Sequence, residues 1–70
     1  MNYKKLRQLL GLSPSEFGRL LGFGSPQVRV SELENGKKNG SPQLQRFCTF
    51  LEYLVENGEK QRILDWWKAL

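Results

Sequence analysis

Apolar residues recur at helical spacing along the chain, and helix-capping residues separate one apolar stretch from the next. The stretch between Asn2, a good N-cap, and Gly11, a good helix stop, carries three leucines on one helical face. The sequence Ser-Pro-Ser-Glu at 13–16 has the form of a capping box with proline at the first helical position. It predicts a second helix that ends near Gly22, and no segment shows the sustained alternation typical of a strand.

The same signals predict three further helices. Ser25-Pro26 starts a third helix that runs to about Glu34, where an Asn-Gly pair follows. Ser41-Pro42 starts a longer fourth helix, and residues 59–70 carry the fifth. The expected fold class is therefore all-α, with five short helices in a single domain that spans residues 1–70.

Length and residue types narrow the possible functions. Seventy residues leave room for one core, and no apolar run approaches the ~18 residues that a membrane span needs. The N-terminal residues lack the features of a signal peptide, so a cytoplasmic protein is expected, without a membrane partner. Histidine is absent, Cys48 is the single cysteine, and the carboxylates are scattered. These features argue against an enzyme, a metal site or a cofactor, and they favour a core position for Cys48.

The net charge of +4 is unevenly distributed. Residues 1–46 contain eight basic and three acidic residues, a net +5, whereas residues 47–70 contain three and four, a net −1. A basic first part suggests contact with a polyanion such as double-stranded DNA. The plainer alternative is a basic protein whose charge serves only solubility.

The third predicted helix has an unusual outer face. At about 100° per residue, Val30 and Leu33 fall on one side, and Val28 falls opposite among polar residues. Gln, Asn and Arg side chains bond base edges in the major groove, and a valine suits a thymine methyl group. The alternative is an ordinary surface helix with one valine left outside the core.

Several short stretches resemble the Cro and phage-repressor type (XRE-like) helix-turn-helix family. They are Leu12-Ser13, Glu16-Phe17, Leu21-Gly22, Val30-Ser31 and Leu33-Glu34-Asn35-Gly36-Lys37, and the resemblance covers roughly residues 3–56. The resemblance implies a lambda-repressor-like bundle whose third helix enters the major groove of DNA. It also implies a sequence-specific, homodimeric transcription regulator, in particular an autorepressor that binds an inverted-repeat operator, with no small-molecule ligand.

The same resemblance assigns roles to individual residues. The base-contacting positions correspond to Gln27, Val28, Arg29, Ser31 and Glu32. The phosphate-contacting positions correspond to Ser13, Ser15, Asn35, Lys37, Lys38, Asn39 and Ser41. Arg7 and Glu34 correspond to an internal ion pair that ties the first helix to the third, and a purely solvated loop is the alternative for the two lysines.

Two positions depart from the family pattern. Pro14 stands where relatives carry a phosphate-contacting glutamine, so this contact is lost or supplied by Ser13 or Ser15. The span from Gly22 to Val30 is also about two residues longer than usual, and a longer turn is expected to tilt or advance the third helix. Compact phage and prophage regulators, including those encoded beside anti-CRISPR genes, resemble this chain in both departures.

Aromatic residues near the C-terminal end suggest a protein contact. Trp66 and Trp67 are adjacent and point about 100° apart, so one of them is surplus to the core. The proposed dimer surface comprises Phe50, Tyr53, Leu54, Ile63, Trp66, Trp67 and Leu70. The alternative is that both indole rings pack onto the first and fourth helices. The rival function is a protein-binding adaptor, such as an antitoxin or inhibitor, which would use the same aromatic residues.

Overall fold

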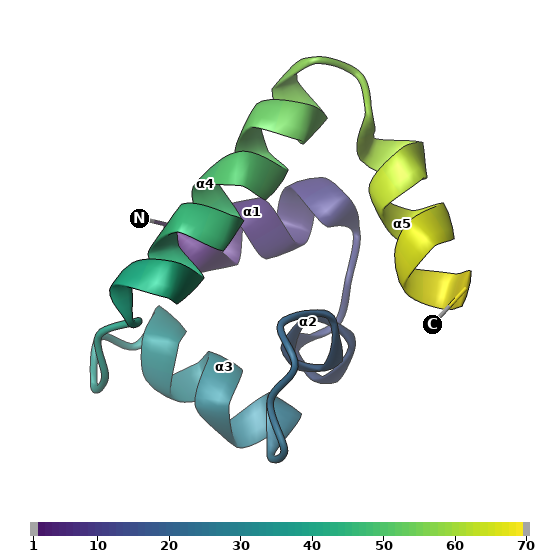
Figure 1. Ribbon diagram of the computed structural model, residues 1–70. Coiled ribbons are helices and arrows are strands. Elements are labelled where there is room, and N and C mark those ends of the chain that lie inside the picture. The colour runs from purple at the N-terminus through teal and green to yellow at the C-terminus, as the bar shows by residue number, and fades with distance from the viewer. Residues whose placement is uncertain (1, 70) are drawn as a thin grey trace.

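The computed structural model describes residues 2–69, and these form five helices in the expected order (Figure 1). The helices are α1 (Tyr3–Leu10), α2 (Pro14–Leu20), α3 (Pro26–Glu34), α4 (Pro42–Glu56) and α5 (Lys60–Ala69). No strand occurs in this part of the chain, so the prediction of an all-α fold is confirmed.

Side-chain caps define three of the helix starts. The Asn2 side chain accepts a hydrogen bond from the Lys5 amide at 2.9 Å, and Ser41 caps α4 in the same way. At α2 the capping box is complete, because Ser13 Oγ accepts from the Glu16 amide at 3.1 Å and Glu16 Oε1 accepts from the Ser13 amide at 2.9 Å. The bond from the Ser13 amide holds the pKa of the Glu16 carboxyl below its usual value.

Helix α3 starts where Ser25-Pro26 predicts it, but not by the expected cap. The backbone of Ser25 has φ −120° and ψ 76°, and its side chain makes no capping hydrogen bond. Pro26 at the first helical position, with its fixed φ, supplies the start instead.

Glycines with a left-handed backbone end the helices next to α3. Gly22, with φ 86°, follows α2, and Gly36, with φ 73°, follows α3. After Gly22 the amide of Phe23 donates to the Gly18 carbonyl at 2.9 Å, and the amide of Gly22 donates to that of Arg19 at 3.0 Å. This pair of bonds is the Schellman motif, which fixes the direction of the chain as it leaves α2.

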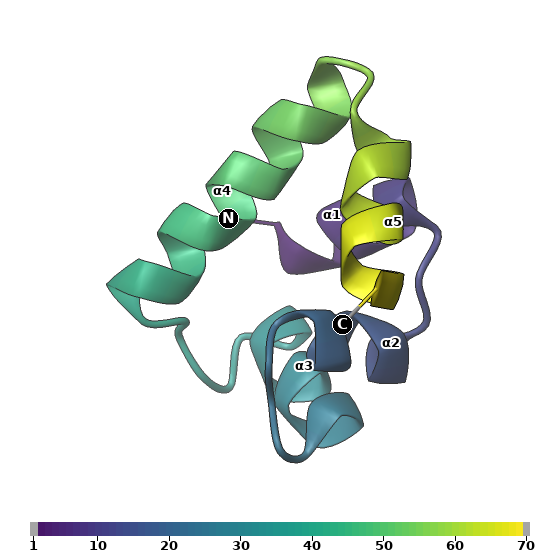
Figure 2. The same ribbon diagram turned by 45° about the vertical axis from the view of Figure 1, so that its right-hand side comes forward.

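One core joins all five helices. Its buried members are Tyr3, Leu6, Leu10, Leu12, Phe17, Leu20, Val30, Leu33, Cys48, Leu51 and Ile63. Helix α2 packs against α3, α1 packs against α3 and α4, and α5 packs against α4. Figures 1 and 2 show that α4 and α5 meet at their connecting turn and diverge from it, while α2 and α3 lie together at the other end of the molecule.

The contact between α2 and α3 depends on the absence of a side chain at Gly18. A Cβ atom at this position would lie 2.5 Å from the Cα and Cβ atoms of Pro26. No real Cβ tolerates that distance from backbone, so α2 and α3 approach as closely as they do because residue 18 is glycine.

Within residues 2–69, no helix is both long enough and apolar enough to cross a membrane.

Candidate nucleic-acid interface

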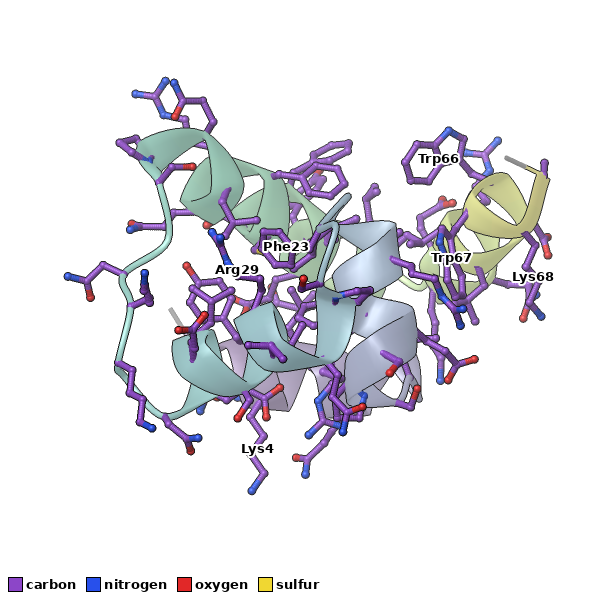
Figure 3. All side chains as sticks on the ribbon, turned by 90° about the horizontal axis from the view of Figure 1, so that it is seen from below. Lys4, Phe23, Arg29, Trp66, Trp67 and Lys68 are labelled. Atoms are coloured by element: carbon purple, nitrogen blue, oxygen red, sulfur yellow. The ribbon has the colours of Figure 1, made fainter. Side chains whose placement is uncertain are left out.

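Helix α3 divides into a core face and an outer face, as the sequence pattern predicts. Val30 is fully buried and Leu33 is 9% exposed, whereas Val28 is 61% exposed. Gln27, Ser31 and Asn35 are also exposed. Figure 3 views the molecule from the side of α2 and α3. An exposed valine among polar side chains is therefore a real feature of this surface.

Four of the five predicted base-contacting residues surround one shallow hollow on α3. Gln27, Val28, Ser31 and Glu32 line it together with Lys37 from the following loop, and its volume is about 430 Å³. We call this the α3 hollow. It combines amide, hydroxyl, carboxylate, ammonium and methyl groups, so its chemistry suits a partner that presents both donors and acceptors.

Weak polar contacts preorganise parts of the outer face. The Ser15 hydroxyl donates to Gln27 Oε1 at 3.5 Å, and Asn35 Nδ2 donates to Ser31 Oγ at 3.2 Å. Both contacts are exposed, so a ligand can replace them at little cost. The first contact brings the start of α2 beside the start of α3, which places a predicted phosphate-contacting residue next to a predicted base-contacting one.

Arg29 is the predicted base-contacting residue that lies apart from the α3 hollow. Its Cζ atom is 5.2 Å from the centroid of the Phe23 ring, within the range of a cation–π contact. Figure 3 shows the two side chains next to each other. The Arg29 Nε atom is 4.0 Å from Glu32 Oε1, and the Arg29 side chain is 53% exposed.

A second depression runs between α3 and the start of α4, and we call it the α3–α4 groove. It has a volume of about 470 Å³, and Arg29, Lys38, Asn39 and Ser41 contribute its polar lining above an apolar floor that includes Phe23. Among the described residues that line it, none is acidic. The groove therefore favours an anion in contact with its basic edge.

The remaining phosphate-contacting candidates are distributed around these two depressions. Lys37 belongs to the α3 hollow, and Lys38 and Asn39 belong to the α3–α4 groove. Ser13 is exposed, but its hydroxyl oxygen is already engaged as the cap of α2.

Arg7 and Glu34 form the predicted ion pair. Arg7 Nε donates to Glu34 Oε2 at 2.7 Å and Arg7 Nη2 donates to Oε1 at 3.1 Å, so the contact is bidentate. The side chains are only 15% and 12% exposed, and Arg7 Nη1 also donates to the Leu12 carbonyl at 3.2 Å. The hydrogen bonds to Glu34 raise the pKa of Arg7, and the pair fixes the end of α3 to α1.

The aromatic residues near the C-terminal end separate into two groups. Phe50, Tyr53 and Trp66 are between 50% and 59% exposed. Trp67 and Leu54 are partly buried against the core, and Figure 3 shows the two indole rings leaving α5 in different directions. Ile63 is only 3% exposed and belongs to the core, and it also lines the groove between α4 and α5. Leu70 lies outside the described residues.

A narrow apolar groove lies between α4 and α5. Its volume is about 280 Å³, and its lining includes Phe47, Phe50, Leu54 and Trp66, with Arg62 at its edge. We call it the α4–α5 groove. Two of the three exposed aromatic residues, Phe50 and Trp66, line this groove.

The thiol and the possible metal ligands of the described residues form no further candidate site. Cys48 is fully buried as expected, and burial raises the pKa of its thiol to about 11, so it is protonated at neutral pH. Between residues 2 and 69 no three His, Cys, Asp or Glu side chains gather in a group that could hold a metal ion.

Two contributors to this surface were missed by sequence reasoning. Phe23 holds Arg29, and Gly18 sets the approach of α2 to α3. The longer turn was a signal for the first, because it carries an aromatic residue just before α3. A glycine inside a short helix was a signal for the second.

Comparisons with known proteins add no family assignment. No family model, no curated protein and no solved structure matches this chain. The similarity to Cro-type helix-turn-helix proteins therefore remains a resemblance carried by the motif residues.

Proposed function

We propose that the protein is a sequence-specific DNA-binding regulator of transcription, a repressor that acts as a homodimer in the cytoplasm and has no catalytic activity. The observation that carries this proposal is the outer face of α3. Gln27, Val28, Ser31 and Glu32 project together from a helix whose other side is anchored in the core. A helix that is anchored on one side, presents polar side chains on the other and has a basic loop beside it suits insertion in a major groove.

The side chains of the α3 hollow suit base edges. Gln27 can donate to and accept from adenine, and Val28 can contact a thymine methyl group. Glu32 can accept from a cytosine amino group, but it repels phosphate, so it would contribute to selectivity rather than to affinity. A surface that combines donors, acceptors and methyl groups supports sequence-specific binding more than nonspecific binding to DNA.

The basic loop after α3 supports contacts with the DNA backbone. Lys37, Lys38 and Asn39 are all exposed, and they line the α3 hollow or the α3–α4 groove. Such contacts position a protein on the duplex without reading sequence. In this proposal, the lysines determine affinity and the side chains of the α3 hollow determine specificity.

Substitutions at Gln27 and Lys37 separate these two roles. A preferred duplex is first selected from a random pool with the wild-type protein, and a scrambled duplex of equal composition serves as its control. We expect Gln27→Ala to weaken binding to the selected duplex by roughly tenfold, the value of a bidentate base contact, and to leave the scrambled duplex unaffected. Lys37→Ala should weaken both duplexes by similar factors.

Two results decide against this assignment. If both variants lose the same factor on both duplexes, the division into specificity and affinity is wrong. If selection enriches no sequence, the protein is not a sequence-specific regulator.

A protein-binding adaptor is the second candidate, and the α4–α5 groove favours it. The groove is apolar and open, and an apolar surface of this kind suits a protein partner. Because the same surface suits a homodimer, DNA binding is what separates the two proposals. An adaptor should show no salt-dependent retention on duplex DNA.

A further inference from the structure

The turn between α2 and α3 holds an aromatic ring at a defined place. The Schellman bonds around Gly22 fix the backbone of Phe23, and the Phe23 side chain is partly buried against the core. The turn therefore presents a ring of limited freedom to residues at the beginning of α3.

Arg29 is the residue that this ring contacts. On the helix wheel Arg29 lies about 60° from Glu32 and about 100° from Val28, so a long side chain at this position can extend either toward the α3 hollow or away from it. The 5.2 Å distance between Arg29 Cζ and the Phe23 centroid selects the second direction. Arg29 lines the α3–α4 groove with Lys38 and does not line the α3 hollow.

The contact leaves the arginine available to an anion. A guanidinium group that interacts with a ring through its face keeps its N–H donors, which lie in its own plane. The carboxylate nearest to Arg29 is Glu32 at 4.0 Å, beyond hydrogen-bond distance. Arg29 can therefore donate to a phosphate oxygen at the edge of the groove while Phe23 holds it.

We propose that Phe23 is a positioning residue that directs Arg29 to a phosphate of the DNA backbone, which leaves base contact to the other four residues of the outer face. This inference rests on the proposed DNA-binding function. The proposal also gives the lengthened turn between α2 and α3 a function, because this turn brings the Phe23 ring beside α3. Arg29 then belongs with Lys38 as a source of affinity.

The first test concerns the contact itself and needs no DNA. In the NMR spectrum of the free protein, the Arg29 side-chain protons should show the upfield ring-current shift of a group above an aromatic face. The shift should persist in Phe23→Tyr and vanish in Phe23→Leu, which keeps an apolar side chain but removes the ring. A wild-type spectrum without this shift overturns the proposal.

The second test measures binding to the selected and scrambled duplexes over a range of salt concentrations. Arg29→Ala should weaken both duplexes by a similar factor and reduce the slope of log K against log salt by about 1.8, because the homodimer loses one phosphate contact worth about 0.9 from each subunit. Phe23→Leu should weaken both by about two- to fivefold for each subunit, the value of an exposed cation–π contact, and Phe23→Tyr should leave binding unchanged. Lys60→Ala also removes one positive charge, from an exposed residue at the start of α5 that lines neither the α3 hollow nor either groove, so it is the charge-matched control and should change neither.

The double variant separates positioning from folding. In the Arg29→Ala background, Phe23→Leu should cause no further loss, because there is no arginine left to hold. If the losses of affinity are additive, Phe23 acts through the fold. If Arg29→Ala weakens only the selected duplex, Arg29 contacts bases. Either result overturns the proposal. If the wild-type protein binds neither duplex, the proposed function fails and the DNA role of Arg29 fails with it, whereas the ring-current shift still reports the contact.

Discussion

At the scale of single residues, the pair of Arg7 and Glu34 links the stability of the bundle to the position of α3. Glu34 is the last residue of α3, and Arg7 lies one turn before the end of α1. Both are largely buried and share two short hydrogen bonds. Removing one partner leaves the charge of the other uncompensated in a region of restricted solvent access. This lowers the free energy of unfolding more than breaking a surface ion pair would.

We expect Glu34→Ala to lower the free energy of unfolding by about 2 kcal/mol, because a partly buried carboxylate that accepts two charged hydrogen bonds is lost. For a chain of this size the melting temperature should fall by roughly 10 °C. Glu59→Ala is the matched control, because Glu59 pairs at 3.4 Å with an arginine whose side chain is 84% exposed. The control should change stability by less than about 0.5 kcal/mol. Equal effects in a thermal melt would contradict the structural role of the Arg7 pair.

At the scale of elements, the geometry of the helix-turn-helix depends on how closely α2 and α3 approach. Gly18 is buried in α2 directly beneath Pro26, the first residue of α3. Two physical effects oppose each other at this position. Helix propensity favours alanine over glycine by about 1 kcal/mol, while steric overlap with the Pro26 backbone disfavours it.

We expect Gly18→Ala to destabilise the fold by about 2 kcal/mol, because backbone at 2.5 Å cannot give way as a flexible side chain can. Gly24→Ala is the control, since nothing lies within 4 Å of a Cβ at that position. The control should change the melting temperature little. Stabilisation by Gly18→Ala in chemical denaturation would mean that propensity dominates and that α2 and α3 are less closely packed than described.

The elements also show what the sequence can and cannot predict. Helix starts and stops depend on bonds between residues three to five apart, such as those of Ser13 with Glu16, so local patterns predicted all five helices. The Arg7–Glu34 pair was predicted through family resemblance, and the structure contains it. The contact of Phe23 with Arg29 depends on the path of a turn, which local patterns do not determine. Ser25 stands at the start of α3 as its pattern with Pro26 predicts, but its side chain makes no capping hydrogen bond.

At the scale of the whole molecule, the two surfaces of interest lie on different elements. The α3 hollow is formed by α3 and the loop after it, and the α4–α5 groove is formed by α4 and α5. A dimer formed through the second surface would leave the first free in both copies. Two recognition helices about 34 Å apart would then match successive major grooves on one side of the duplex.

We expect the chain to sediment as a dimer at micromolar concentration, with twice its own mass of 8.1 kDa. Trp66→Glu should give a monomer, because it puts a charge among the apolar residues of the α4–α5 groove. Leu9→Glu is the control, since Leu9 is a 40% exposed apolar residue on α1, away from that groove. A wild-type protein that sediments only as a monomer excludes the proposed dimer.

The proposed function requires above all that the outer face of α3 and the loop after it bind DNA. The direct measurement is the fluorescence anisotropy of a labelled random-sequence duplex, titrated with the wild-type protein at 50 mM and 200 mM salt. With about four to six phosphate contacts from each subunit, we predict micromolar or tighter binding at the lower concentration and an affinity at least about a thousandfold weaker at the higher one. Absence of binding at 50 mM salt, or binding that salt leaves unchanged, would contradict the account.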